Sequence, residues 1–219
     1  MGGVVSFLNQ LKSQATERQS QHVADGQMLE SNRAKSELAC KTAWLYVADL
    51  AKQLNVIVPD GPRLAIDGKT PWPAMKLCAF RADSRKKMLR DKEVFDYIAM
   101  GWDIVVREGV VPSGSVSVNF PPDLERVEKR IAAGAVKHER IEVRHPEKNT
   151  LQAIRFDYAM QARGSLKITA DHDTAHLLFR MANTSGFEIH QARVAAERVT
   201  GDLLDELAKM IVGQPNRFL

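Results

Sequence analysis

The first quarter of the chain has the residue pattern of a long helix. Val4 to Val58 contain no proline, and most residues in this span are good helix formers. Residues 9–33 are strongly polar, whereas the second half carries an apolar stripe at helical spacing. The stripe consists of Ala39, Ala43, Tyr46, Val47, Leu50 and Leu54. We therefore expect a helical region over residues 1–58, in which the second half packs on the core and the first half projects or joins another chain.

Residues 59–73 are rich in proline and glycine, and the apolar period changes after them. Pro59-Asp60-Gly61-Pro62 ends the helix, since the residue before a proline avoids helical backbone. Beyond this linker, apolar and polar residues alternate in short runs, which is typical of antiparallel strands. The predicted strands span residues 75–82, 93–106, 114–120, 136–145, 151–162, 166–171, 175–182 and 187–194.

Two amphipathic helices are predicted among these strands. One begins near Asp123 and ends at Gly134, and the other spans residues 201–212 and ends at Gly213. The sequence thus predicts an α+β fold, in which residues 74–219 form an antiparallel sheet of β-hairpins covered by two helices. Residues 95–100 (FDYIAM) resemble residues 156–160 (FDYAM), and a helix beginning Asp-Leu follows each. This likeness suggests a duplicated strands-then-helix unit over residues 74–134 and 135–213.

Apolar alternation also predicts which residues oppose one another in the C-terminal hairpins, because a slip of one residue would turn every apolar side chain to the wrong face. The predicted pairs are Met160–Ile168, Tyr158–Ala170, Asp157–Asp171, Ile168–Phe179, Asp171–His176, Phe179–Ile189 and Arg180–Glu188. These pairs predict one core face, which the C-terminal helix covers. Its residues are Ile154, Phe156, Tyr158, Met160, Ile168, Leu177, Phe179, Met181, Phe187 and Ile189.

The opposite face of this predicted sheet brings Asp157, Asp171 and His176 into a row. Two carboxylates beside an imidazole can bind a divalent ion or carry out acid–base chemistry. Polar residues are also what the solvated face of an antiparallel sheet ordinarily carries, and the spacing matches no established metal motif. The three residues are therefore candidates for a metal-assisted enzyme, while the prediction is that no metal is bound.

A basic stretch between Arg81 and Lys92 is predicted to lie at a hairpin tip. Its cations Arg85, Lys86, Lys87 and Arg90 are candidates for binding an anion such as a nucleic-acid phosphate. Together with Lys137, Arg140 and Arg144 in a later strand, they could form a wider phosphate-binding surface. Aspartates interrupt the stretch and the nearby aromatic residues alternate as core positions do, so a solvated loop is the simpler interpretation.

Composition restricts the functional classes further. The formal net charge of +4 permits an anionic partner without requiring one, and the two cysteines, Cys40 and Cys78, have no metal-binding or disulfide spacing. We find no common nucleotide-binding, hydrolase or metalloprotease motif. We therefore expect a cytoplasmic, non-catalytic binding or assembly protein without a cofactor, whose helical region contacts a protein partner or a second copy. A small-molecule-binding domain, with walls that include Trp44, Trp72 or Trp102, a nucleic-acid-binding protein and a metal-assisted enzyme remain alternatives.

Overall fold

The computed structural model describes residues 7–219 and has the predicted α+β fold. A helix of 51 residues comes first, and all eight predicted strands and both later helices follow it. The elements are α1 (Phe7–Ile57), β1 (Met75–Leu89), β2 (Lys92–Val106), β3 (Ser113–Val118), α2 (Pro121–Ala133), β4 (His138–Arg144), β5 (Leu151–Ala159), β6 (Ala162–Asp171), β7 (His176–Ala182), β8 (Ile189–Ala195), a 3-10 turn (Ala196–Arg198) and α3 (Gly201–Ile211).

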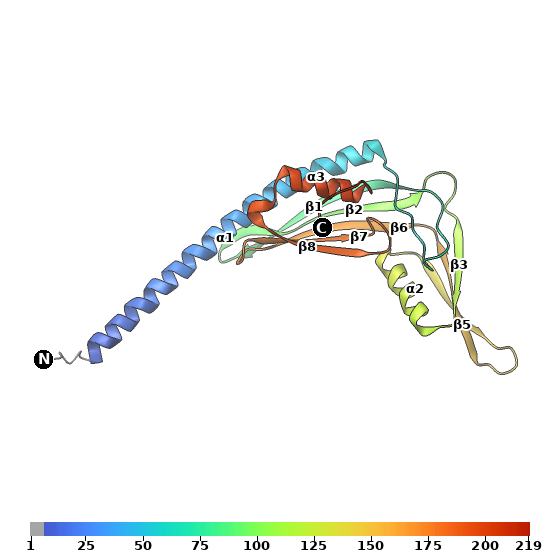
Figure 1. Ribbon diagram of the computed structural model, residues 1–219, viewed down its shortest axis with the longest axis horizontal. Coiled ribbons are helices and arrows are strands. Elements are labelled where there is room, and N and C mark those ends of the chain that lie inside the picture. The colour runs from blue at the N-terminus through green and yellow to red at the C-terminus, as the bar shows by residue number, and fades with distance from the viewer. Residues whose placement is uncertain (1–6) are drawn as a thin grey trace.

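The strands form two antiparallel sheets. One has five strands in the order β1-β2-β6-β7-β8, and the other has three in the order β3-β5-β4. Figure 1 shows α1 and α3 together on one side of the five-stranded sheet, while the three-stranded sheet and α2 extend from its far end. The face that the two helices cover is called the inner face below, and the opposite one the outer face.

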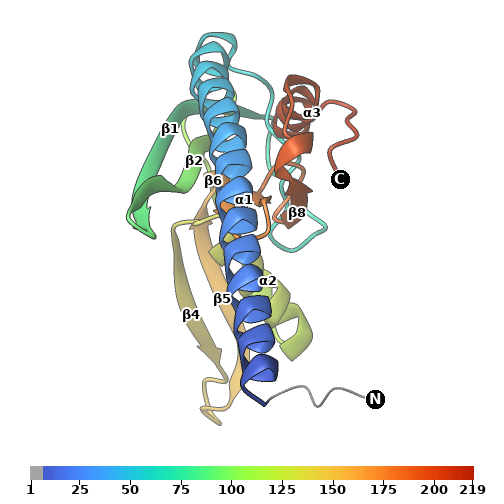
Figure 2. The same cartoon turned by 90° about the vertical axis from the view of Figure 1, so that its left-hand side faces the viewer.

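Apolar residues of α1 and α3 fill the inner face. The buried stripe of α1 is made of small residues, so the helix lies close to the sheet: Ser36, Ala39, Cys40, Ala43, Val47, Ala51 and Leu54. In α3, Leu204, Leu207, Met210 and Ile211 are buried as the pattern predicted, and Thr200 caps the first turn. Figure 2 shows the two helices side by side over the strands. The prediction that a C-terminal helix covers the sheet is confirmed, but α1 shares that role.

The predicted linker over residues 59–73 is part of the core. Leu64, Ile66 and Trp72 are all buried within it. The Trp72 amide donates to the Leu64 carbonyl at 2.7 Å, and Arg130 on α2 donates to the Ile66 carbonyl at 2.9 Å. The segment therefore packs against both sheets instead of hanging free between two bodies.

The predicted hairpin between residues 151–162 and 166–171 is wrong. β5 pairs with β3 and β4 in one sheet, whereas β6 pairs with β2 and β7 in the other, so the chain changes sheets between the two strands. Gly164, in the stretch between the two predicted strands, lies inside β6 opposite Trp102. A Cβ atom at Gly164 would come within 2.1 Å of the indole, so this glycine makes room for the ring. The predicted pairs Met160–Ile168, Tyr158–Ala170 and Asp157–Asp171 do not exist.

The β6–β7 register is confirmed, and the β7–β8 register is wrong. Ile168 opposes Phe179 and Asp171 opposes His176, as predicted. In the next hairpin, Phe179 opposes Ala192 instead of Ile189, and Arg180 opposes Gln191 instead of Glu188. Asn183 explains the longer loop, because its amide group donates to the carbonyls of Ala133 and Arg163 at 2.7 and 2.6 Å. Ile189 is consequently exposed.

The predicted core face is divided between the two sheets. Ile168, Leu177, Phe179 and Met181 are buried on the inner face, whereas Ile154, Phe156 and Tyr158 belong to the three-stranded sheet. The duplicated unit is not supported either. The two similar segments lie in β2 and β5, which are in different sheets, and the strands of the two supposed copies enter the sheets in a different order.

Candidate functional site

The long helix α1 has two halves with different surroundings, and we give each a name. The docked segment, residues 30–57, carries the buried stripe and packs on β1 and β2. The arm, residues 7–29, extends away from the sheet in Figure 1, and almost every residue in it is exposed. Its apolar residues include Phe7, Leu8 and Leu11, which are 72, 57 and 45% exposed. The arm is thus the largest element of the described chain that nothing covers.

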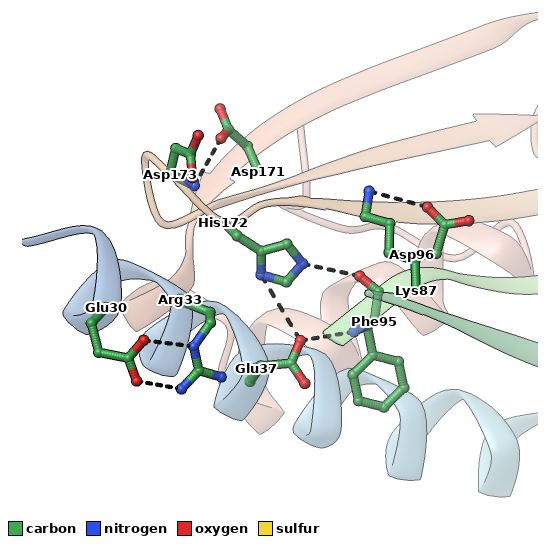
Figure 3. Close-up of polar contacts among 9 residues, drawn as sticks. All are labelled: Glu30, Arg33, Glu37, Lys87, Phe95, Asp96, Asp171, His172 and Asp173. Carbon is green, nitrogen blue, oxygen red and sulfur yellow. Dashed lines mark hydrogen bonds and ion pairs between the residues drawn. The ribbon is translucent and has the colours of Figure 1, made fainter. Parts of the chain in front are cut away.

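A cluster of polar contacts holds the helix where the arm meets the docked segment (Figure 3). We call it the anchor cluster; it consists of Glu30, Asn32, Arg33, Glu37, Arg90, Lys92, Phe95, His172 and Asp173. Arg33 binds both carboxylate oxygens of Glu30 at 3.0 and 2.6 Å, and Lys92 reaches Glu30 at 2.5 Å. On the other side, Asp173 accepts from Arg90 at 2.7 Å and, through its carbonyl, from Asn32 at 2.6 Å. The cluster therefore ties α1 to the β1–β2 and β6–β7 turns.

The turns are placed for this role by their own sequences. Arg90 and Asp91 both have positive φ, at 48° and 62°, and form a two-residue turn that closes the β1–β2 hairpin. In the other turn, Asp171 accepts from the Thr174 hydroxyl at 2.6 Å and orders the loop that carries His172 and Asp173. The hydrogen bond to Thr174 lowers the pKa of Asp171. Each turn thus has a defined conformation that places its side chains beside α1.

Buried contacts to the backbone of Phe95 lie beneath these exposed ion pairs. The Phe95 amide donates to Glu37 at 2.8 Å, and Nε2 of His172 lies 3.0 Å from the Phe95 carbonyl. Because a carbonyl oxygen only accepts, Nε2 carries the proton. Nδ1 of His172 faces the Glu37 carboxylate at 3.9 Å, and the imidazole is almost fully buried. The side chains satisfy Phe95 because β6 pairs with β2 only from Tyr97 onward.

A second contact of the same kind lies near the end of the docked segment. The β1–β2 register shifts between Cys78 and Arg81, where Ala79 has a φ of 53°. Asn55 of α1 fills this bulge, because its amide group accepts from the Phe80 amide and donates to the Phe80 carbonyl, both at 2.8 Å. Glu37 and Asn55 are eighteen residues apart, about five helical turns, and so lie on one side of α1. The docked segment is thereby fixed in register on the hairpin.

Three pKa shifts follow from this packing. The hydrogen bond from Arg33, and then the one from Lys92, lower the pKa of the Glu30 carboxyl from 4.5 to about 2. Burial raises the pKa of the Cys40 thiol from 9.0 to about 12, so Cys40 is a packing residue and not a nucleophile. Tyr46 donates to Asp205 of α3 at 2.6 Å, and burial followed by this bond raises its pKa. These groups connect elements of the fold: Glu30 joins α1 to the start of β2, Cys40 packs in the core and Tyr46 joins α1 to α3.

The predicted metal residues are not brought together. Asp157 is on β5 of the three-stranded sheet, where Ser115 donates to it at 2.7 Å and Arg155 lies 3.1 Å away. Asp171 and His176 do oppose each other in the five-stranded sheet. Over residues 7–219, no group of three or more His, Cys, Asp or Glu side chains is arranged to hold a metal ion.

The predicted basic stretch does lie at the end of the β1–β2 hairpin, but its four candidate anion-binding cations already have carboxylate partners. Lys86 pairs with Glu93 at 2.7 Å, Lys87 with Asp96 at 3.2 Å and Arg90 with Asp173 at 2.7 Å, while Arg85 lies 3.9 Å from Asp96. The later group does not join them, because Lys137, Arg140 and Arg144 lie in or beside β4 of the other sheet.

The outer face of the five-stranded sheet is more basic than the hairpin tip. Several cations share this face, with aspartates between them, including Arg81, Arg85, Arg163, Lys167, Arg180 and Arg193. Arg81 and Arg180 have no carboxylate within 4.0 Å in residues 7–219, and the Lys167 ammonium lies 5.2 Å from the centre of the Tyr97 ring. A shallow hollow of about 320 Å³ opens between Arg81 and Arg163.

The three tryptophans do not share a pocket. Trp72 stacks on Tyr158, with ring centres 5.9 Å apart, and lines an open hollow of about 440 Å³ beside Pro62 and Pro73. Trp102 stacks on Phe80 at 5.7 Å on the inner face, and Trp44 lies half-buried on α1. The aromatic residues thus form separate parts of the core and do not enclose a ligand cavity.

Glu37, Asn55 and His172 could not be identified as contact residues from the sequence. Each bonds to a backbone group far away in the chain, and such contacts leave no periodic pattern. The one available signal is that Glu37 and Asn55 flank the buried stripe of α1 on the same side.

In the part of the chain that the structure describes, no helix is long and apolar enough to cross a membrane. Comparison with protein-family models, with curated proteins and with solved structures found no match to this chain.

Proposed function

We propose that this protein is a non-catalytic assembly protein that uses its arm to join another protein chain, either a partner or a second copy. One observation carries the proposal: a helix anchored firmly at residues 30–37 continues for about six more turns with nothing packed on it. In proteins, most of the stability of a helix comes from packing one of its faces against another element. A partner surface would supply that packing.

The anchor cluster, where the arm meets the docked segment, also supports an assembly role. A helix that merely frayed into solvent would need no anchoring where it leaves the sheet. Here Glu30 pairs with Lys92, Asn32 donates to the Asp173 carbonyl and Glu37 accepts from the Phe95 amide, and these contacts hold α1 at that point. The arm is thereby presented in a fixed direction, which lowers the entropic cost of binding a partner. The cytoplasmic location expected from the sequence stays a prediction.

Sedimentation equilibrium of the full chain tests this proposal. Leu8 and Leu11 lie on one side of the arm, whereas Asn9 and Ser13 lie on the other, so Leu8→Asp/Leu11→Asp can be compared with Asn9→Asp/Ser13→Asp. We expect a mass above the 24.5 kDa of one chain, lowered by the leucine pair of changes and kept by the control pair. A mass that is the same for all three proteins contradicts the proposal.

A second candidate function is the binding of a single-stranded nucleic acid on the outer face of the five-stranded sheet. The observation that favours it is the set of cations on that face, including Arg81 and Arg180 without carboxylate partners, beside the exposed side of Tyr97. Cations track phosphates, and an aromatic ring can stack on a base.

Charge reversal at Arg81, Lys167 and Arg180 tests this second candidate. It should remove binding of a single-stranded oligonucleotide and most of its salt dependence, while reversal of Lys137, Arg140 and Arg144 should not. No binding by the unaltered protein at low salt would exclude the candidate.

A further inference from the structure

The arm continues the stripe that packs on the sheet. Alternate steps of three and four residues connect a series along one side of the helix: Leu8, Leu11, Ala15, Arg18, His22, Asp25 and Leu29. Continued from Leu29 through Asn32, the same spacing reaches Ser36, Ala39 and Ala43, which are buried against the sheet. Such a spacing is the seam of a two-stranded coiled coil. The arm therefore carries a seam without a second strand.

The order of residues in this seam distinguishes between two ways of pairing with itself. In a parallel pair, each seam position faces its own copy, so Arg18 would meet Arg18, His22 would meet His22 and Asp25 would meet Asp25. Like charges would then face each other in the middle of the interface, which is unfavourable. In an antiparallel pair, Arg18 comes next to His22 and Asp25 of the other copy, so opposite charges approach.

The rest of the molecule limits how far two antiparallel arms can overlap. Glu30, Asn32 and Arg33 belong to the anchor cluster, and Ala39 is buried against the sheet, so an arm cannot slide past this point. The furthest overlap that the body allows places Leu11 of each copy in one layer with Leu29 of the other. A shift of one heptad away from the body would put Leu11 opposite His22, and Leu29 would then face no residue of the described arm. Charge and apolar contacts thus favour the same register.

Building on the proposed function, we infer that the arm's partner is a second copy of this chain, lying antiparallel. The interface pairs Leu11 with Leu29, Ala15 with Asp25 and Arg18 with His22, each of them twice by symmetry. Leu8 of one copy reaches Asn32 of the other, at the edge of the anchor cluster. The dimer then holds its two five-stranded sheets at opposite ends of a helix pair about 30 Å long. Its outer faces stay uncovered.

Disulfide formation in the full chain tests the orientation. Ala15→Cys/Asp25→Cys, in a Cys78→Ser background, places two thiols in one layer of the antiparallel pair. Within one chain these positions are about 15 Å apart along the helix, so the bond can form only between chains. We expect the double variant to give a covalent dimer on mild oxidation and Ala15→Cys alone to stay monomeric under denaturing electrophoresis. A covalent dimer of Ala15→Cys alone would show a parallel pair and overturn the inference.

Exchange of charges gives an independent test without cysteines. Arg18→Glu and Asp25→Arg should each weaken dimerisation about tenfold or more, because each places like charges side by side. Arg18→Glu/Asp25→Arg should restore it. The positions are two turns apart within one chain, so the rescue reports a contact between chains.

These outcomes separate this inference from the proposed function. A mass that falls with Leu8→Asp/Leu11→Asp, together with no covalent dimer from Ala15→Cys/Asp25→Cys and no rescue by charge exchange, leaves the assembly role and removes the antiparallel pair. A full chain that sediments as one copy at about 1 mM removes both.

Discussion

The arm and the docked segment are parts of one continuous helix, yet different forces keep them helical. The docked segment packs small residues against a sheet and adds two side chains that bond to backbone groups of the hairpin, at Phe95 and Phe80. The arm has neither, and its middle carries mainly polar residues. Its helix depends on intrinsic propensity and on whatever packs against it.

This comparison shows that a continuous helix is not a uniform one. Burial, and not helix propensity, marks where the structural role of α1 ends and where a binding role can begin. Matched substitutions in the two segments measure that difference directly, since the backbone around them is the same.

The largest effect is expected from truncating a leucine in each segment. Leu54 is 4% exposed and Leu11 is 45% exposed. Leu54→Ala should lower the free energy of unfolding by about 2–5 kcal/mol, because it leaves a cavity between helix and sheet. Leu11→Ala should change it by about 0.5 kcal/mol or less under conditions where the chain is monomeric. Chemical denaturation at low protein concentration provides both values, and equal losses would show that the arm packs on its own body.

A glutamate in each segment gives a smaller contrast. Glu37→Ala removes the acceptor for the Phe95 amide, so we expect a loss of about 1–3 kcal/mol for a buried group left unpaired. Glu17→Ala in the exposed arm should alter stability by about 0.5 kcal/mol or less. Hydrogen exchange of the Phe95 amide provides a local readout, which should become faster only in Glu37→Ala. An unchanged exchange rate would mean that another group satisfies this amide.

The smallest expected effect concerns pH at the boundary between the segments. The pKa of Glu30 is lowered from 4.5 to about 2, chiefly by Arg33 and then by Lys92. Its contribution to holding the helix should therefore be complete above about pH 4.5 and be lost as the pH falls towards 2. Because the group is exposed to solvent, salt should reduce the effect. An NMR titration of the Glu30 carboxyl carbon checks this, and a midpoint near 4.5 would show that the two ion pairs do not persist in solution.

The sequence predicted where the helices and strands lie along the chain better than it predicted which strands pair with one another. Periodicity located the long helix, the strands and the amphipathic face of α3, because each depends on residues close together in the chain. It misplaced β5 because the chain changes sheets within a short connection, and the glycine that resembles a turn, Gly164, instead makes room for Trp102. That contact joins strands far apart in sequence, and no local pattern reports it.

The sequence likewise predicted only part of the candidate site. The polar first half of α1 and its scattered apolar residues were visible in the sequence, and so was the basic stretch near residue 90. The anchor cluster was not, because Glu37 and His172 act on a backbone group exposed by the end of the β2–β6 ladder. Asp157 was a candidate metal ligand only because the predicted hairpin placed it opposite Asp171, and the structure does not contain that hairpin.

The anchor cluster holds α1 near residue 33, close to the middle of the helix. Roughly 35 Å of helix lies on one side and roughly 40 Å on the other. Glu37 lies beside the anchor cluster, and Asn55 lies near the other end of the docked segment. A force that bends the arm would therefore act first on the two turns at the anchor cluster and only then on the bulge at Phe80. A force between two joined chains would consequently strain the ion pairs and the His172 loop before it disturbed the buried apolar side chains.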